Sequence, residues 1–160
     1  MAHDYLDARG IAYERLTFSA ETPKGAANVA RTLGYQDRQM VKTLIFRSGK
    51  GEHVLVMLGG DQSAVSGLLK KAIGNRNIRM ANPDDITELT GGYVIGSIPA
   101  FGWQPDRFRT FIEKSLLDCD ILGVGAGVWG NEIMITPQNL IAATNAIVVN
   151  LTDRNQPVYK

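Results

Sequence analysis

A lysine in an apolar strand pattern is the residue of this chain whose type and position are best suited to chemistry. In the stretch QMVKTLIFRSGKG (39–51), Met40, Lys42, Leu44 and Phe46 share one face of a strand with a period of two. An ammonium among bulky apolar neighbours has two interpretations. Its stem can cover apolar surface while the amine reaches water, or the amine can line a cavity and bind an anion or a carbonyl oxygen.

Two glycine-rich loops are the second feature with chemical potential. They are GGYVIGSIPAFGW (91–103) and GVGAGVWGNE (123–132). Backbone N–H groups of such loops can surround a small space and stabilise an oxyanion or hold a phosphate, although ordinary turns have the same composition. Trp103 and Trp129 flank the loops. We interpret them as core or pocket wall, with stacking on a base as the alternative.

Other catalytic side chains are few. We expect His3 in a mobile terminal segment and His53 at the surface of a strand with polar flanks. Cys119 lies in LLDCDIL, where we expect a small buried residue with a raised thiol pKa. The sequence has no nucleophile elbow, no phosphate-binding loop and no Cys/His cluster. We therefore predict no metal site.

The composition is that of an ordinary globular protein. With 160 residues, 44% apolar residues and 21% charged residues, the chain suits one domain over residues 1–160. A net charge of +1 argues against a broad nucleic-acid surface, so DNA is not an expected partner. The stretch MAHDYLDARG (1–10) lacks the apolar core of a signal peptide, and no apolar run approaches the length of a membrane span. We expect a cytoplasmic protein without a membrane partner.

Helix and strand patterns alternate along the chain without a strict βαβ rhythm. Thr22 and Asn82 are expected N-caps, each followed by a proline at the first helical position. The expected helices cover 2–9, 22–34, 59–74, 82–89 and 136–144. The expected strands cover 11–18, 41–48, 52–58, 77–81, 131–135 and 146–152, with two more around a short helix in 107–125. This order predicts an α/β (α+β) fold, a mixed sheet with helices packed around it.

Seven motifs occur in an order that resembles the YbaK/prolyl-tRNA-synthetase-associated editing domain family, over nearly the whole chain. They are GIAYE, TPKGAANVARTLG, KTLIF, NIRMANPDDITELTG, GSIPAFG, VGAGVWGNEI and TPQNLIAAT. The resemblance implies a strongly curved mixed β-sheet surrounded by helices, with a pocket between them. It also implies hydrolysis in trans of aminoacyl-tRNA that carries the wrong amino acid, chiefly mischarged tRNA(Pro), without a metal or organic cofactor. The implied partners are the 3′ acceptor end of tRNA and a prolyl-tRNA synthetase.

The resemblance also assigns site residues. Lys42 matches the family lysine, which would bind a phosphate or ribose oxygen of the terminal adenosine and polarise the ester carbonyl. Gly96 and Pro99 match the G-x-x-P-type loop and join Lys42 in the expected catalytic set. Substrate contacts are expected from nine further residues: Phe18, Thr22, Ser97, Ile98, Ala100, Phe101, Gly125, Gly127 and Glu132.

The chain departs from the family at several of these positions. Some members carry a serine and a basic pair where this chain has Gly125, Val128 and Trp129, and Phe18 lacks a hydroxyl at an aromatic position. These departures weaken cysteine as the substrate amino acid and favour alanine or another small residue. They also leave an alternative open, a non-catalytic module that binds aminoacyl-tRNA or an aminoacyl-nucleotide and associates with a synthetase.

Overall fold

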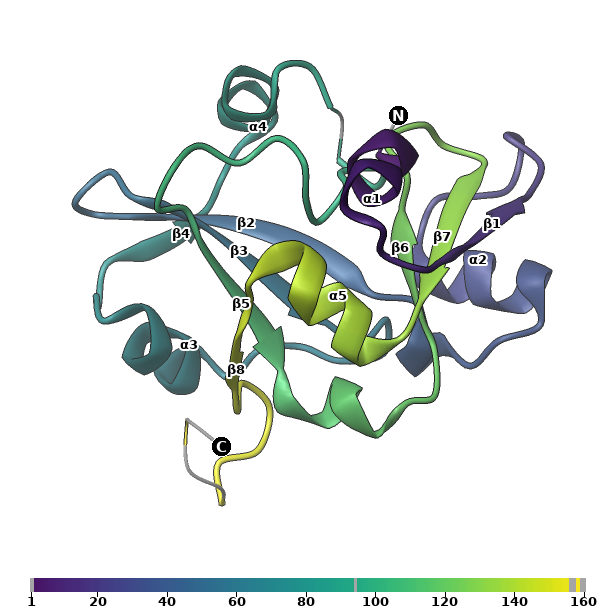
Figure 1. The fold of residues 1–160 in the computed structure, drawn as a ribbon. Coiled ribbons are helices and arrows are strands. Elements are labelled where there is room, and N and C mark those ends of the chain that lie inside the picture. Colours follow the sequence, from purple (N-terminus) through teal and green to yellow (C-terminus); the bar gives the residue numbers. More distant parts are fainter. Residues whose placement is uncertain (1, 94, 156–157, 159–160) are drawn as a thin grey trace.

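The computed structural model describes residues 2–93, 95–155 and 158 (Figure 1). The helices are α1 (His3–Arg9), α2 (Ala26–Leu33), α3 (Ser66–Ile73), α4 (Pro83–Thr90) and α5 (Pro137–Thr144), with short 3₁₀ segments η1 (Asp37–Gln39) and η2 (Lys114–Asp118). The strands are β1 (Glu14–Thr17), β2 (Lys42–Ser48), β3 (His53–Leu58), β4 (Ile78–Met80), β5 (Arg109–Glu113), β6 (Leu122–Gly125), β7 (Asn131–Ile135) and β8 (Ile147–Val149).

The predicted mixed class of helices and strands is confirmed. The strands form two sheets, whereas one sheet was expected. A five-stranded mixed sheet has the order β4-β2-β3-β5-β8, and a three-stranded antiparallel sheet has the order β1-β7-β6. The sheets meet where Met40 bridges Gly123 and the Val41 N–H donates to the Gly123 carbonyl over 2.8 Å. The chain between the sheets is therefore anchored immediately before Lys42.

The central strand β3 is apolar on both faces, and each face has its own cover. Leu55 and Met57 join a core with α1, α5 and the three-stranded sheet, whereas Val54 and Val56 pack with the apolar side of α3. Figure 1 shows α5 lying across the five-stranded sheet. Because successive side chains of a strand point to opposite faces, a continuous apolar run such as VLVML is typical of a strand that is covered on both sides.

Proline-started helices are confirmed at two positions and wrong at a third. Asn82 caps α4 by accepting from the Asp85 N–H at 2.8 Å, and Thr136 caps α5 in the same way. By contrast, α2 begins at Ala26, because the Thr22 N–H donates to the Ser19 carbonyl and the preceding segment forms a turn. Thr22 is therefore not an N-cap.

Two other expectations need correction. The predicted helix 59–74 begins only at Ser66, because residues 59–62 form a turn. His3 is 2% exposed and lies in α1 with its ring 5.8 Å from that of Tyr13, so it is not part of a mobile terminus. Its burial, with a smaller effect of Arg15, lowers the pKa of the His3 imidazole. Among the residues that the structure describes, no helix has the length and apolarity that crossing a bilayer requires.

Candidate functional site

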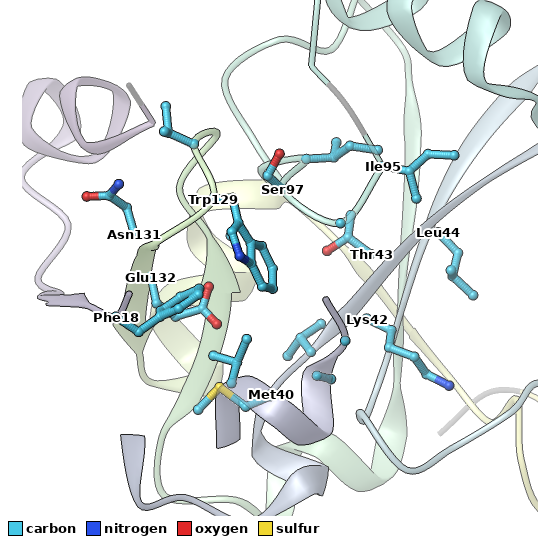
Figure 2. Close-up of a pocket in the computed structure, with 18 residues that line it drawn as sticks. Phe18, Met40, Lys42, Thr43, Leu44, Ile95, Ser97, Trp129, Asn131 and Glu132 are labelled. Carbon is cyan, nitrogen blue, oxygen red and sulfur yellow. The ribbon is translucent and has the colours of Figure 1, made fainter. Parts of the chain in front are cut away.

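A cavity of about 210 Å3 lies where the two sheets meet (Figure 2). The start of β2 forms one wall, and residues 95–98 of the first glycine loop form the second. The second glycine loop with the start of β7, and the N-terminal part of α2, complete it. The lining thus comes from five stretches of the chain, because Phe18 after β1 also contributes, and two of them are the glycine loops.

The two loops approach each other through their main chains. A Cβ atom on Gly125 would lie 3.2 Å from the Ser97 carbonyl oxygen and 3.5 Å from that of Ile98. Gly96 has a φ of 95°, which favours glycine. The absence of a side chain at Gly125 therefore allows the loops to meet beside the cavity, and Gly96 allows the conformation of its own loop. A side chain at position 125 would require the opposite loop to shift by a few tenths of an ångström.

Glu132 brings a carboxyl group into the apolar part of the cavity. It lies in the middle strand of the three-stranded sheet, opposite Leu16 and Gly125, and is 8% exposed. Figure 2 shows its carboxyl pointing into the cavity beside Phe18 and Trp129. No hydrogen bond or ion pair of this carboxyl occurs among the described residues. Burial raises the pKa of the Glu132 carboxyl to about 8, so the group is mostly protonated at neutral pH.

Aromatic side chains form the wall around this carboxyl. The rings of Phe18 and Trp129 meet edge to face with centroids 4.9 Å apart. The Trp129 indole Nε1 donates to the Thr22 carbonyl at 3.1 Å, and the Lys24 ammonium lies 4.1 Å from the centroid of the indole ring. Trp129 is thus pocket wall, held in place by the turn before α2.

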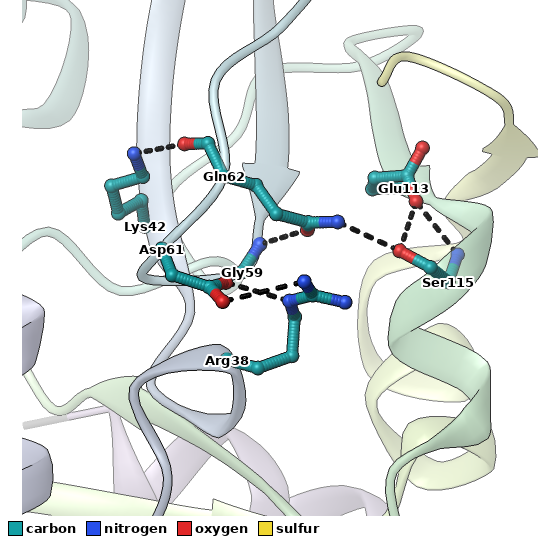
Figure 3. A network of polar contacts seen from close by, with 7 residues as sticks. All are labelled: Arg38, Lys42, Gly59, Asp61, Gln62, Glu113 and Ser115. Atoms are coloured by element: carbon teal, nitrogen blue, oxygen red, sulfur yellow. Dashed lines mark hydrogen bonds and ion pairs between the residues drawn. The ribbon is translucent and has the colours of Figure 1, made fainter. Parts of the chain in front are cut away.

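Lys42 lines the cavity with its stem, but its amine lies at the opposite end from Glu132. Figure 2 shows the ammonium pointing away from the Glu132 carboxyl and Trp129. It donates instead to the main-chain carbonyl of Gln62, in the turn after β3 (Figure 3). The predicted position of the amine between the glycine loops is not the one in this structure. The cavity therefore contains a buried carboxyl, whereas Lys42 contributes its stem to the lining and holds its ammonium against the turn after β3.

Seven of the twelve predicted site residues line this cavity. They are Phe18, Lys42, Gly96, Ser97, Ile98, Gly125 and Glu132. Residues that the sequence analysis did not assign to the site, such as Met40, Leu44 and Asn131, also line it. The sequence could have indicated them, because Met40 and Leu44 are two positions from Lys42 and Asn131 is next to Glu132.

The other five predicted residues lie outside the lining. The Thr22 and Pro99 carbonyls accept from the indoles of Trp129 and Trp103. Ala100 is fully buried, and Phe101 stacks on Tyr5 at 5.4 Å in the main core. A Cβ atom on Gly127 would lie 2.7 Å from the Tyr93 ring. The first glycine loop thus turns away from the cavity after Ile98 and enters the core.

Metal-ligating side chains do not gather in the described part of the chain: no group of three or more His, Cys, Asp or Glu residues is placed to hold an ion. Cys119 is half-buried and unpaired, and burial raises the pKa of its thiol. The chemistry available at the cavity is that of a buried carboxyl and main-chain amides, with the Lys42 ammonium beside it at the turn after β3.

Comparison with known proteins gives a consistent picture. The model of the aminoacyl-tRNA editing domain family matches residues 20–143. The Enterococcus faecalis protein EbsC, whose name describes a Cys-tRNA(Pro)/Cys-tRNA(Cys) deacylase, is 27% identical over 150 residues, which is 93% of this chain and 90% of EbsC. The multifunctional Ser/Thr-tRNA deacylase ProXp-y of Escherichia coli is 28% identical over 104 residues, which is 64% of this chain and 61% of that protein.

A solved structure agrees with these relatives. It is described as that of a trans-editing enzyme for prolyl tRNA synthetase, and it superposes with a TM-score of 0.84 at 26% identity over 94% of each chain.

Proposed function

Because the chain belongs to the aminoacyl-tRNA editing domain family, we propose that its cavity hydrolyses the ester bond of mischarged aminoacyl-tRNA in trans. The proposed substrate is tRNA(Pro) carrying alanine or another small amino acid, and the proposed place of action is the cytoplasm. The observation that supports this most strongly is a cavity between the two sheets that holds a buried carboxyl without a described partner, Glu132, and has the Lys42 stem in its lining.

The carboxyl end suits the amino group of the substrate. A carboxyl without a described partner, 8% exposed and surrounded by apolar side chains, gains most from a cationic ligand. Lys42 does not supply that cation, because its amine points away. The α-ammonium of an aminoacyl ester would bind Glu132 and favour its ionised form. Glu132 would then select esters with a free amino group.

The Lys42 ammonium suits the ribose and terminal phosphate. An ammonium has three N–H donors, and the Gln62 carbonyl accepts from one of them. The remaining donors of Lys42 can bind a phosphate or ribose oxygen and attract electron density from the ester. The cavity mouth also carries Ile95 and Val128, which are 56% and 51% exposed and give the terminal nucleoside an apolar surface.

The size of the cavity favours a small amino-acid side chain. About 210 Å3 must hold the amino group, the ester and the side chain together. Phe18 and Trp129 close the carboxyl end with rigid rings, and the two glycine loops approach each other closely at Gly125. The names of the relatives mention cysteine, serine and threonine, which are of similar size.

The proposed reaction needs no side-chain nucleophile. Water attacks the ester carbonyl carbon, the carbon–oxygen bond to the ribose breaks, and the ribose oxygen takes up a proton, which leaves a free amino acid and a free tRNA end. An aminoacyl ester is already activated, and its neighbouring ribose hydroxyl can orient the water. The protein then contributes orientation, through Glu132 and Lys42, and charge stabilisation by Lys42 and main-chain N–H groups of residues 96–98.

A panel of charged tRNAs tests this proposal. Purified protein is incubated with Ala-, Ser-, Thr-, Cys- and Pro-tRNA(Pro), and the loss of the aminoacyl bond is followed for each. We expect the fastest loss from Ala-tRNA(Pro) or another of the small non-cognate species, and slow loss from N-acetyl-Ala-tRNA(Pro), which has no α-ammonium. Equal rates for the free and the acetylated amino group would refute the role of Glu132.

The same panel separates the second candidate function. Gly125, Val128 and Trp129 replace the serine and basic pair of some family members, which favours a module that binds without turnover. Such a module would retain aminoacyl-tRNA in a filter-binding assay while the ester bond stays intact for as long as in buffer.

A further inference from the structure

The turn that accepts the Lys42 ammonium is held from within by one buried side chain. Gln62 is 8% exposed, and its Oε1 accepts from the Gly59 N–H at 2.8 Å. The Gln62 N–H donates back to the Gly59 carbonyl at 2.9 Å. The turn 59–62 is therefore closed twice, once by the main chain and once by the Gln62 amide.

The same amide connects the turn to the interior of the five-stranded sheet (Figure 3). Gln62 Nε2 donates to Ser115 Oγ at 2.9 Å, and Ser115 Oγ donates to the Glu113 carboxylate. Glu113 is 1% exposed, and it also accepts from the N–H groups of Ser115 and Leu151 at 2.7 and 2.8 Å. Because every member of this chain of hydrogen bonds is tied to a further group, the Gln62 amide has little freedom to move.

The outer side of the turn is fixed as well. Asp61 accepts two hydrogen bonds from the Arg38 guanidinium, at 2.6 and 3.3 Å. That contact, with a smaller contribution from the charge of Lys42, lowers the pKa of the Asp61 carboxyl. A Cβ atom on Gly60 would lie 2.3 Å from the Asp37 carbonyl oxygen, so the turn rests directly on η1. The carbonyl of Gln62 consequently has a defined place relative to β2.

We propose that Gln62 is a positioning residue for the reaction, which acts by fixing its own carbonyl as the acceptor of Lys42. One N–H of the ammonium binds that carbonyl, and the other two can then bind a ribose or phosphate oxygen of the substrate. Gln62 does not line the cavity and touches no reacting atom. The inference rests on the proposed function of Lys42, and it explains why a buried glutamine amide follows the glycine pair at 59–60.

Two variants and one matched control test this inference. Gln62→Ala removes both hydrogen bonds of the Gln62 side chain, and Ser115→Ala removes only the link to the interior of the sheet, in case the first variant is poorly folded. Gln39→Ala is the control, because the Gln39 amide also bridges two main-chain groups, the Gln36 N–H at 3.0 Å and the Ile121 carbonyl at 3.2 Å, but has no contact with the turn.

Two readouts are measured on each folded variant. The first is kcat/KM for the preferred aminoacyl-tRNA, which we expect to fall about tenfold or more in Gln62→Ala. The second is the labelling rate of Lys42 by an amine-reactive reagent, resolved by peptide mass spectrometry, with exposed Lys50 as the internal reference. We expect labelling of Lys42 to rise about three- to tenfold when the acceptor is loosened. Both effects should be smaller in Ser115→Ala and absent in Gln39→Ala.

The two readouts separate this inference from the proposed function. Unchanged labelling of Lys42 in Gln62→Ala overturns the positioning role, whatever the rate. Faster labelling with an unchanged kcat/KM also overturns it, because the position of the ammonium would then have no catalytic consequence. Retention of the wild-type rate in Lys42→Ala would refute the catalytic role of the lysine itself, even where the labelling of Lys42 behaves as expected.

Discussion

Substitution of Glu132 by glutamine should change how the stability of the protein depends on pH. The carboxyl has a pKa of about 8 in the folded chain, above its ordinary value of 4.5. Between these two pH values the folded state keeps a proton that the unfolded state releases. The stability of the wild type therefore falls as pH rises through this window, and the fall is complete above pH 8. The glutamine variant has no group that ionises there and does not share this loss.

The magnitude follows from the size of the pKa shift. A rise from 4.5 to about 8 corresponds to about 5 kcal/mol of unfolding free energy lost across the window. The side chain is 8% exposed, so solvent screening reduces this only slightly. Small domains have unfolding free energies of roughly 5–15 kcal/mol. A loss of this size is therefore easily measured by urea unfolding.

The assay compares urea unfolding of the wild type and Glu132→Gln at several values between pH 5 and pH 9. The control is Glu88→Gln, in which an exposed glutamate of α4 undergoes the same substitution. We expect the variant to gain on the wild type steadily as pH rises, and the control to follow the wild type. A difference between wild type and Glu132→Gln that stays constant from pH 5 to pH 9 would refute the burial argument for this carboxyl.

Three further substitutions test how the surrounding fold is held. Gly60→Ala places a Cβ atom 2.3 Å from a main-chain oxygen of η1 and should lower the unfolding free energy by about 1–3 kcal/mol or more. Gly67→Ala adds a Cβ atom in open space in α3 and should raise the unfolding free energy by about 0.5–1 kcal/mol. Urea titration of both variants distinguishes the steric contact at Gly60 from the effect of replacing any glycine by alanine. Asn82→Ala removes the cap of α4 and should cost about 0.5–2 kcal/mol, measured in the same way; no loss would mean that the cap is replaced by water. The Arg109 hydrogen bonds lower the pKa of Glu52, so its contribution is present above its ordinary pKa and disappears in acid. Glu52→Gln should therefore lower the melting temperature at pH 7 but not near pH 2, and an equal loss at both would contradict the ion pair.

Local signals in the sequence were sufficient where the structure is local. The asparagine and proline at 82–83 predict the start of α4, and the glycines of the SGKG turn predict the β2–β3 hairpin, because caps and tight turns depend on neighbouring residues. The expected start of α2 at Thr22 was wrong, because Thr22 lies in a turn closed on Ser19, and the carbonyl of Thr22 in that turn accepts from the indole of Trp129, which is distant in the sequence. Propensity and capping rules contain no information about such a partner.

The candidate site shows the same division. Lys42 and Glu132 were expected in the site and do line one cavity, in different sheets. The direction of the Lys42 amine was not predictable, because it depends on the turn 59–62, which Ser115 anchors from another part of the chain. Phe101 was expected to contact the substrate, but its ring stacks on Tyr5 in the core. The loop motif alone could not predict this, because Tyr5 is distant in the sequence.

The most direct test of the account is deacylation by wild-type protein and Lys42→Ala, side by side on the preferred aminoacyl-tRNA. Lys50→Ala is the matched control, since this exposed lysine follows the same strand. We expect Lys42→Ala to unfold like the wild type in urea and to leave the ester bond as stable as it is in buffer, while Lys50→Ala hydrolyses it at the wild-type rate. Wild-type turnover by a folded Lys42→Ala protein would contradict the account.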